Sequence, residues 1–140
     1  MISIQKGEDL LSISLCTILS YRKDEPEFQK LVINWNKKIL IEIEDFYPIL
    51  IIFDGTDIKF KVSEIDKKVD LKVKMDIYTL LDLAYGRLGP VGAVLKRKIR
   101  VKGLLKVGVL LKFIKILLKS MQMVASDPNN NYYELNKDTR

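Results

Sequence analysis

The chain has 140 residues, 48% apolar and 30% charged, which is enough for one domain with a substantial core. It contains no histidine and a single cysteine, Cys16, which excludes an internal disulfide, a Cys/His zinc site and the usual general base near neutral pH. The net charge of +6 favours an anionic partner such as membrane lipid, nucleic acid or an acidic protein, and it fits plain solubility equally well.

Two helices are predicted in the first 36 residues. Residues 1–7 show no pattern and are expected to be a loose leader, whereas residues 8–21 carry leucines and isoleucines at helical spacing. Asp24 and Glu27 have the spacing of a capping box, with Pro26 in the first turn. An apolar stripe at i, i+3, i+4 and i+7 follows and places Trp35 in the core, on a helix that ends near residue 36.

Three strands are predicted from residue 38 to residue 62. In the first strand the side chains alternate between two faces. One face carries isoleucines, and the other includes charged residues. Residues 49–53 are apolar on both faces, which is typical of a strand covered from two sides. Asp54 and Gly55 begin a hairpin turn, after which Lys59 and Lys61 point outward from the third strand.

The second half of the chain alternates between strands and helices. We expect a strand at 69–75, a helix at 77–85 capped by Asp76 and ended by Gly86, a break at 89–92, a strand at 98–102, and a last helix at 104–119. A meander of strands followed by strands and helices in turn argues for an α+β fold. Asp127 and Pro128 stop the last helix, so residues 1–125 form one predicted domain and residues 126–140 a flexible tail.

Three segments in this order resemble the sterol-carrier-protein-2 (SCP2) family of lipid-binding domains. They are K-K-V-D-L-K-V-K-M-D (67–76), L-L-D-L-A-Y-G-R-L-G-P (80–90) and R-K-I-R-V-K-G (97–103). The resemblance implies a five-stranded mixed sheet, mostly antiparallel, with helices packed on one face around an apolar tunnel. It also implies a non-catalytic function in which the tunnel holds a lipid.

The last predicted helix has an unusually broad apolar surface. Lys112, Lys115 and Lys119 share one narrow stripe, and apolar residues cover about two thirds of the circumference, beyond an ordinary core-facing stripe. Two interpretations are open: the surface is buried as plain core, or part of it lines a cavity or touches a membrane. The resemblance favours the second interpretation. Candidate tunnel walls, each of which could also be simple core, are Ile77, Leu80, Leu81, Tyr85, Leu88, Val91, Val94, Leu95, Leu110, Phe113, Ile114 and Leu117.

A basic face is predicted on two strands. Its members alternate outward and would share one side of the sheet if the strands are neighbours: Lys72, Lys74, Lys98, Arg100 and Lys102. They form either a solvated surface or a face attracted to an anionic bilayer. Nucleic acid is not the expected partner, because Phe53 and Phe60 are in phase with buried residues and leave no outward stacking platform.

Taken with these patterns, the resemblance to the SCP2 family implies a cytoplasmic lipid-transfer protein, peripheral at membranes as one option, that holds an acyl, isoprenoid or sterol-like ligand. No enzyme activity, cofactor or metal site is expected, because no nucleophile–base pair or metal-binding spacing occurs. The chain shows no convincing secretory signal, and its longest apolar run is too short and too charged to cross a bilayer. The alternative is an accessory protein of the same fold that uses its last helix to form a homodimer or bind a partner.

Overall fold

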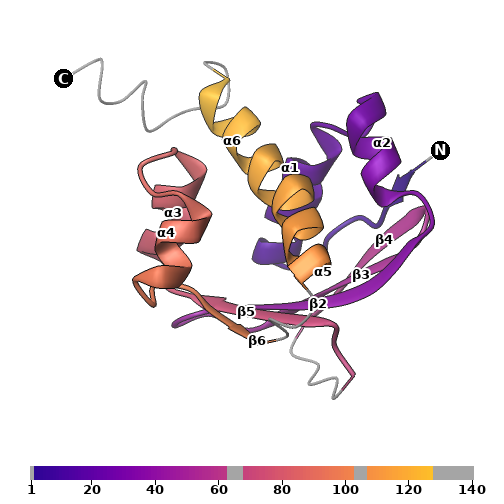
Figure 1. Ribbon diagram of the computed structural model, residues 1–140. Coiled ribbons are helices and arrows are strands. Elements are labelled where there is room, and N and C mark those ends of the chain that lie inside the picture. The colour runs from indigo at the N-terminus through magenta and orange to yellow at the C-terminus, as the bar shows by residue number, and fades with distance from the viewer. Residues whose placement is uncertain (1, 63–67, 103–106, 128–140) are drawn as a thin grey trace.

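The computed structural model describes residues 2–62, 68–102 and 107–127. One sheet carries all of the helices on a single face, which confirms the predicted α+β architecture (Figure 1). The helices are α1 (Leu10–Ser20), α2 (Pro26–Val32), α3 (Ile77–Ala84), α4 (Pro90–Leu95), α5 (Val107–Phe113), the π-helical turn η1 (Ile114–Leu118) and α6 (Lys119–Ser126). The strands are β1 (Ser3–Ile4), β2 (Trp35–Ile43), β3 (Ile49–Gly55), β4 (Asp57–Val62), β5 (Leu71–Met75) and β6 (Arg100–Lys102).

Within the described ranges the sheet has six strands rather than the expected five, in the order β1-β4-β3-β2-β5-β6. β2, β3 and β4 form the predicted antiparallel meander, and Gly55 at a φ of 68° makes the turn between β3 and β4. β5 then pairs with β2 in parallel, and β6 pairs with β5 antiparallel. The chain must cross over the sheet to reach β5, and this leaves β5 and β6 at one side, beneath α3 and α4 (Figure 1).

The sixth strand is β1, which falls within the segment expected to be a loose leader, so that expectation is wrong. Ser3 N–H donates to Thr56 O at 2.8 Å, and Gln5 N–H donates to Ile58 O at 2.8 Å. Ile2 is buried in the core beside them. A two-residue strand is too short to show a period of two, which explains why the sequence pattern missed it.

Trp35 begins β2, whereas the sequence analysis placed it on a helix that ends near residue 36, so that prediction is wrong. Helix α2 ends at Val32, and Asn34, at a φ of 59°, turns the chain into the sheet. Trp35 is nevertheless buried as expected, and its ring packs on Phe53 with the centroids 4.8 Å apart. The predicted capping box is also absent: Glu25 is the N-cap residue of α2, and its side chain makes no cap hydrogen bond.

Helix α3 follows its predicted signals, since Asp76 Oδ1 accepts from Thr79 N–H at 2.7 Å and Gly86 has a φ of 75°. The predicted break at 89–92 is wrong, because Pro90 opens the short helix α4. β6 is shorter than predicted, and Lys98 precedes it in a turn. The long C-terminal helix extends to Ser126, beyond the predicted end at 119. Its predicted start at 104 and the tail after residue 127 lie outside the described residues.

Candidate ligand-binding cavity

An apolar cavity of about 70 Å³ lies between the helices and the β5–β6 end of the sheet. Val73, Met75 and Val101 come from the inward faces of β5 and β6 because side chains alternate along a strand. Helices α3 and α4 form one wall, and α5, η1 and α6 form the opposite wall (Figure 1). None of the described residues that line the cavity is charged. A space lined in this way can bind an apolar group.

Six of the sequence-predicted wall residues line this cavity: Leu80, Val94, Leu110, Phe113, Ile114 and Leu117. Ile77 and Leu88 pack partly buried against the core instead. Leu81, Val91 and Leu95 are exposed to solvent and do not line it, which corrects their predicted placement. Tyr85 borders a separate open depression between α3 and α6 and stacks under the Arg87 guanidinium, whose carbon lies 5.2 Å from the ring centroid.

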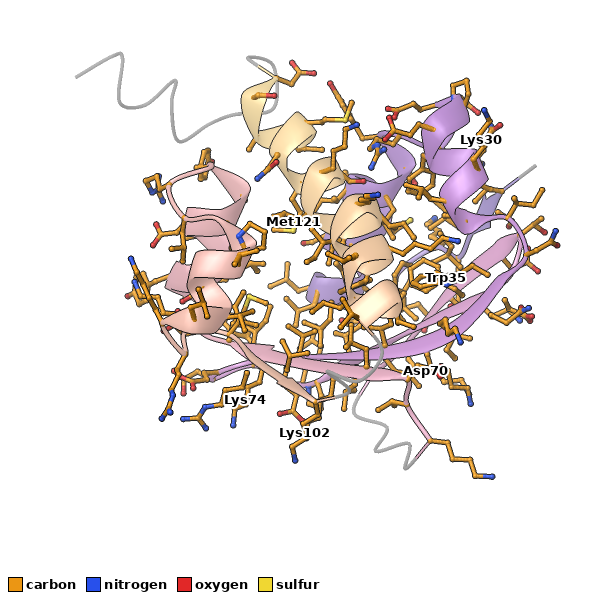
Figure 2. All side chains as sticks on the ribbon, viewed as in Figure 1. Lys30, Trp35, Asp70, Lys74, Lys102 and Met121 are labelled. Atoms are coloured by element: carbon orange, nitrogen blue, oxygen red, sulfur yellow. The ribbon has the colours of Figure 1, made fainter. Side chains whose placement is uncertain are left out.

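The sequence analysis missed the remaining wall residues, half of which lie on β5, β6 and α6. They are Val73, Met75, Leu83, Pro90, Ile99, Val101, Leu118 and Met121. Alternation had placed the strand residues on the inward face, but it does not distinguish a cavity wall from close-packed core. Figure 2 shows Met121 pointing from α6 into the space between the helices.

A second apolar cavity, of about 80 Å³, lies on the α1 side of the same helical layer. Its own walls come from α1, β2 and β3, and include Leu15, Ile41 and Ile49. Leu80, Leu117 and Met121 line both cavities, so these side chains form the partition between them.

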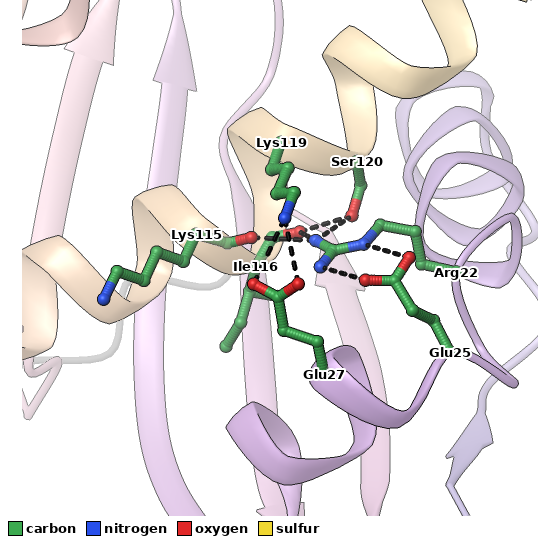
Figure 3. Close-up of polar contacts among 7 residues, drawn as sticks. All are labelled: Arg22, Glu25, Glu27, Lys115, Ile116, Lys119 and Ser120. Carbon is green, nitrogen blue, oxygen red and sulfur yellow. Dashed lines mark hydrogen bonds and ion pairs between the residues drawn. The ribbon is translucent and has the colours of Figure 1, made fainter.

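The helix that supplies this partition is held by a buried arginine (Figure 3). The side chain of Arg22 has no solvent exposure, and its Nη1 donates to Lys115 O at 2.8 Å and to Ser120 Oγ at 3.2 Å. Ser120 Oγ also donates to Ile116 O at 2.5 Å. A π-helical turn displaces main-chain carbonyls from ordinary helical bonding, and these donors satisfy them. Arg22 therefore holds in place the π-helical turn that carries Ile114 and Leu117.

Two carboxylates complete this cluster. Glu25 Oε1 accepts from Arg22 Nη2 at 3.0 Å, and Glu27 pairs with Lys119 Nζ at 3.0 Å on the exposed side of the same helix (Figure 3). The hydrogen bond from Arg22, with a smaller contribution from the charge of Lys119, lowers the pKa of Glu25 below its ordinary 4.5 against the opposing effect of burial. The cluster is thus a charged clamp between the α1–α2 connection and the C-terminal helix.

The basic face is present on the side of the sheet opposite the helices. Lys72 lies opposite Lys102, and Lys74 lies opposite Arg100, in the antiparallel ladder between β5 and β6. Figure 2 shows Lys74 and Lys102 pointing away from the helical layer. Lys98 is exposed but stands in the turn before β6, so four of the five predicted residues are strand neighbours. Lys72 is also paired with Glu42, at 3.2 Å.

Other kinds of site find little support among the described residues. No group of three histidine, cysteine, aspartate or glutamate side chains in this part of the chain could hold a metal ion. None of the described helices combines the length and the apolar character needed to span a bilayer. The open depression between α3 and α6 measures about 570 Å³, but polar residues such as Lys119 and Gln122 line it, so it suits an apolar ligand less well.

Comparison with solved structures shows the same fold in several proteins. The sterol carrier protein domain 2 of Helicoverpa armigera is 18% identical, with a TM-score of 0.59 over 85% of this chain and 94% of that chain. The UbiJ-SCP2 ubiquinone synthesis protein is 14% identical, with a TM-score of 0.59 over 87% of this chain and 99% of that chain.

Part of a larger enzyme also matches. The inverting sec-alkylsulfatase Pisa1 from Pseudomonas sp. is 19% identical, with a TM-score of 0.55 over 64% of this chain. The matched region is only 14% of the sulfatase chain, so the likeness concerns one portion of that enzyme and its fold. Comparison with curated protein sequences gives no match.

The family assignment comes from the sequence itself. The model of the SCP-2 sterol transfer family matches residues 17–117, which run from α1 to η1 and include both strands and all but one of the helices that line the first cavity. The fold agrees with this match over 101 of the 140 residues, and the chain belongs to the SCP-2 sterol transfer family.

Proposed function

We propose that this protein is a non-catalytic lipid carrier that holds an apolar chain in the cavity between its helices and β5–β6. The observation that carries this proposal is a space lined by apolar side chains within a fold of the SCP-2 sterol transfer family. Burial of each methylene group of a ligand contributes about 0.8 kcal/mol, so an acyl chain needs no polar anchor to bind.

The size of the cavities favours a flexible chain over a rigid ring system. At about 70 and about 80 Å³, each is far below the 300–1,000 Å³ of an ordinary ligand site. A single acyl or isoprenoid chain can thread through both if the partition side chains change rotamer. A sterol-like ligand requires the helices themselves to move apart, which is a larger rearrangement.

The alternative function, a homodimer or partner complex formed through the last helix, receives less support. Phe113, Ile116 and Leu117 of that helix are buried within the chain itself. The middle of the helix therefore covers the sheet and the cavity, whereas Val107 and Leu111 near its start are exposed. The outward basic face suits exchange of ligand at anionic membranes, because each basic residue near such a surface contributes about 1 kcal/mol of attraction.

The test is native mass spectrometry of freshly purified protein, with organic extraction of any bound molecule, followed by uptake of a fluorescent fatty acid by delipidated protein in vesicle-free buffer. Val94→Phe should block uptake because Val94 lines the cavity. Val91→Phe is the matched control, since Val91 lies on the same helix but is exposed. Wild-type protein that carries no lipid and takes up none contradicts the proposal, and so does equal uptake by the two variants.

A further inference from the structure

Helix α4 presents apolar side chains on two opposite sides. Pro90 and Val94 line the cavity, and Ala93 is fully buried. Val91 and Leu95, one turn apart, point the other way and are 70% and 77% exposed. Single exposed apolar residues are common on protein surfaces, but a cavity wall whose outer side is also apolar is not explained by the packing of this chain.

Basic residues adjoin this exposed pair. Lys96, Arg97 and Lys98 follow α4 directly and are all exposed. Their main-chain N–H groups donate back to the carbonyls of residues 92–94 at 2.9–3.1 Å, which folds the three residues onto the end of the helix. Arg97 has a φ of 58°, the left-handed conformation that such a helix end requires. The main chain of these three basic residues is therefore held at the end of α4 that carries Leu95.

The surrounding sequence is basic over a long distance. No acidic residue occurs between Asp82 and Asp127, whereas ten basic residues do: Arg87, Lys96, Arg97, Lys98, Arg100, Lys102, Lys106, Lys112, Lys115 and Lys119. Asp76, which caps α3, is the acidic group whose charge interacts with Lys98. Exposed valine and leucine beside this excess of cations match the chemistry of an anionic bilayer, with an apolar interior beneath a negatively charged surface.

We propose that residues 90–98, here called the docking segment, bind an anionic phospholipid bilayer. Val91 and Leu95 enter the acyl boundary, and the side chains of residues 96–98 contact the headgroup phosphates. Because Val94 of the same helix lines the cavity, this contact brings the α4 wall to the membrane surface, where a lipid chain can enter. The entry step rests on the proposed carrier function, whereas the docking step stands on the exposed side chains alone.

The test is flotation of delipidated wild-type protein with vesicles of phosphatidylcholine alone or mixed with phosphatidylserine. Wild type should bind the mixed vesicles only. Val91→Ser/Leu95→Ser should weaken binding at least about tenfold, because it removes the inserted apolar groups. Lys96→Gln/Arg97→Gln/Lys98→Gln should weaken it on the order of a hundredfold at low salt, from the loss of three charges.

Two matched controls separate the docking segment from other surfaces. Leu10→Ser/Ile13→Ser removes exposed apolar side chains from α1 and should leave binding unchanged. Lys74→Gln/Arg100→Gln/Lys102→Gln removes three charges from the sheet face and should weaken binding less than the docking-segment triple. Equal loss from the two triples, normal binding by Val91→Ser/Leu95→Ser, or no binding by wild type overturns the proposal.

Fatty-acid uptake without vesicles separates this inference from the carrier function. The docking-segment variants change exposed side chains, so they should take up the fluorescent fatty acid as wild type does. Protein that takes up lipid in solution but never binds vesicles overturns docking alone. Protein that binds vesicles through the docking segment but takes up no lipid overturns the carrier function and leaves docking intact.

Discussion

Arg22 Nη1 donates a 2.8 Å hydrogen bond to the main-chain oxygen of Lys115, although 93 positions separate the two residues. The bond joins the connection between α1 and α2 to the π-helical turn that carries part of the cavity wall. A charged group without solvent exposure is costly unless it is fully paired, and here a carboxylate, carbonyls and a hydroxyl all receive its hydrogen bonds. π-helical turns are often found at functional sites, and this one lies beside the candidate ligand cavity.

Replacement of Arg22 by methionine should therefore destabilise the protein strongly. The variant leaves the main-chain oxygens of Lys115 and Ile116 with fewer donors and leaves Glu25 without its partner. We expect a loss of about 3 kcal/mol in the free energy of unfolding, measured by urea denaturation. Hydrogen exchange of the amides in η1 and α6 should also become faster, because this region loses its link to α1.

Glu25→Gln provides the control for that loss. The amide oxygen can still accept a hydrogen bond from Arg22, and Glu25 is partly exposed, so the expected cost is at most about 1 kcal/mol. If both variants lose the same amount of unfolding free energy, the loss comes from the Arg22–Glu25 ion pair and not from the anchoring of the π-helical turn. If Arg22→Met unfolds like wild type, the clamp has no structural role.

The stability of the fold should depend on pH through Asp9, the N-cap of α1. Burial alone would raise its pKa, but hydrogen bonds from Ser12 and Tyr47 outweigh burial, and the pKa lies below the ordinary 3.8. A lowered pKa in the folded state adds stability that is complete above the ordinary value of 3.8 and disappears as the pH falls through the folded value. Acidification below about pH 4 should thus weaken the fold.

Asp9→Asn tests this effect because asparagine is an equally good N-cap but does not titrate. Unfolding free energies of both proteins are measured in urea at intervals between neutral and strongly acidic pH. The advantage of wild type over Asp9→Asn should shrink as the pH falls through the folded pKa of Asp9. A difference that stays constant over the whole range contradicts the assignment.

The basic face should cost the protein some stability. Lys74 and Arg100 lie directly opposite each other, and like charges at such positions repel. Arg100→Glu should raise the free energy of unfolding by about 0.5 kcal/mol at low salt, and the gain should fade as salt is added. Lys102→Glu should gain less, because Lys72 opposite it is already paired with Glu42. An absence of any gain in Arg100→Glu would show that the two side chains avoid each other in solution.

Sequence patterns predicted most of the fold where an element was long enough to show its period. They failed at Trp35, since a position seven residues after Phe28 fits a helical stripe, and only the left-handed backbone of Asn34 directs it into a strand. They failed again at α4, where two glycines and a proline indicate a break. There, proline at the first helical position and burial of Ala93 outweigh the low helix propensity of Gly92.

The candidate site was less predictable than the fold. Helical spacing identified Leu110, Phe113 and Leu117 as wall candidates, but it could not show which side of α4 faces inward. Val91 and Val94 are equally apolar, and tertiary packing alone separates them. Nothing in the local sequence indicates that Arg22 is buried, because its partners on the C-terminal helix are fixed only by the fold.

Removal of the partition between the two cavities should change which ligands bind. Leu117→Ala shortens a side chain that lines both spaces, so the cavities should merge. The variant should lose about 2–4 kcal/mol of stability through the added void. Its affinity should shift toward longer members of a series of saturated fatty acids, measured by displacement of a fluorescent fatty acid.

Leu83→Ala is the matched control for chain-length preference. Leu83 lines only the first cavity, so its removal should cost similar stability and widen that space without joining it to the second. The two variants should therefore differ in the chain length that binds best, although both carry a leucine-sized void. If Leu117→Ala keeps the wild-type preference for chain length, the second cavity is not part of the ligand path. The acyl chain of the ligand must then lie wholly between α4 and β5–β6.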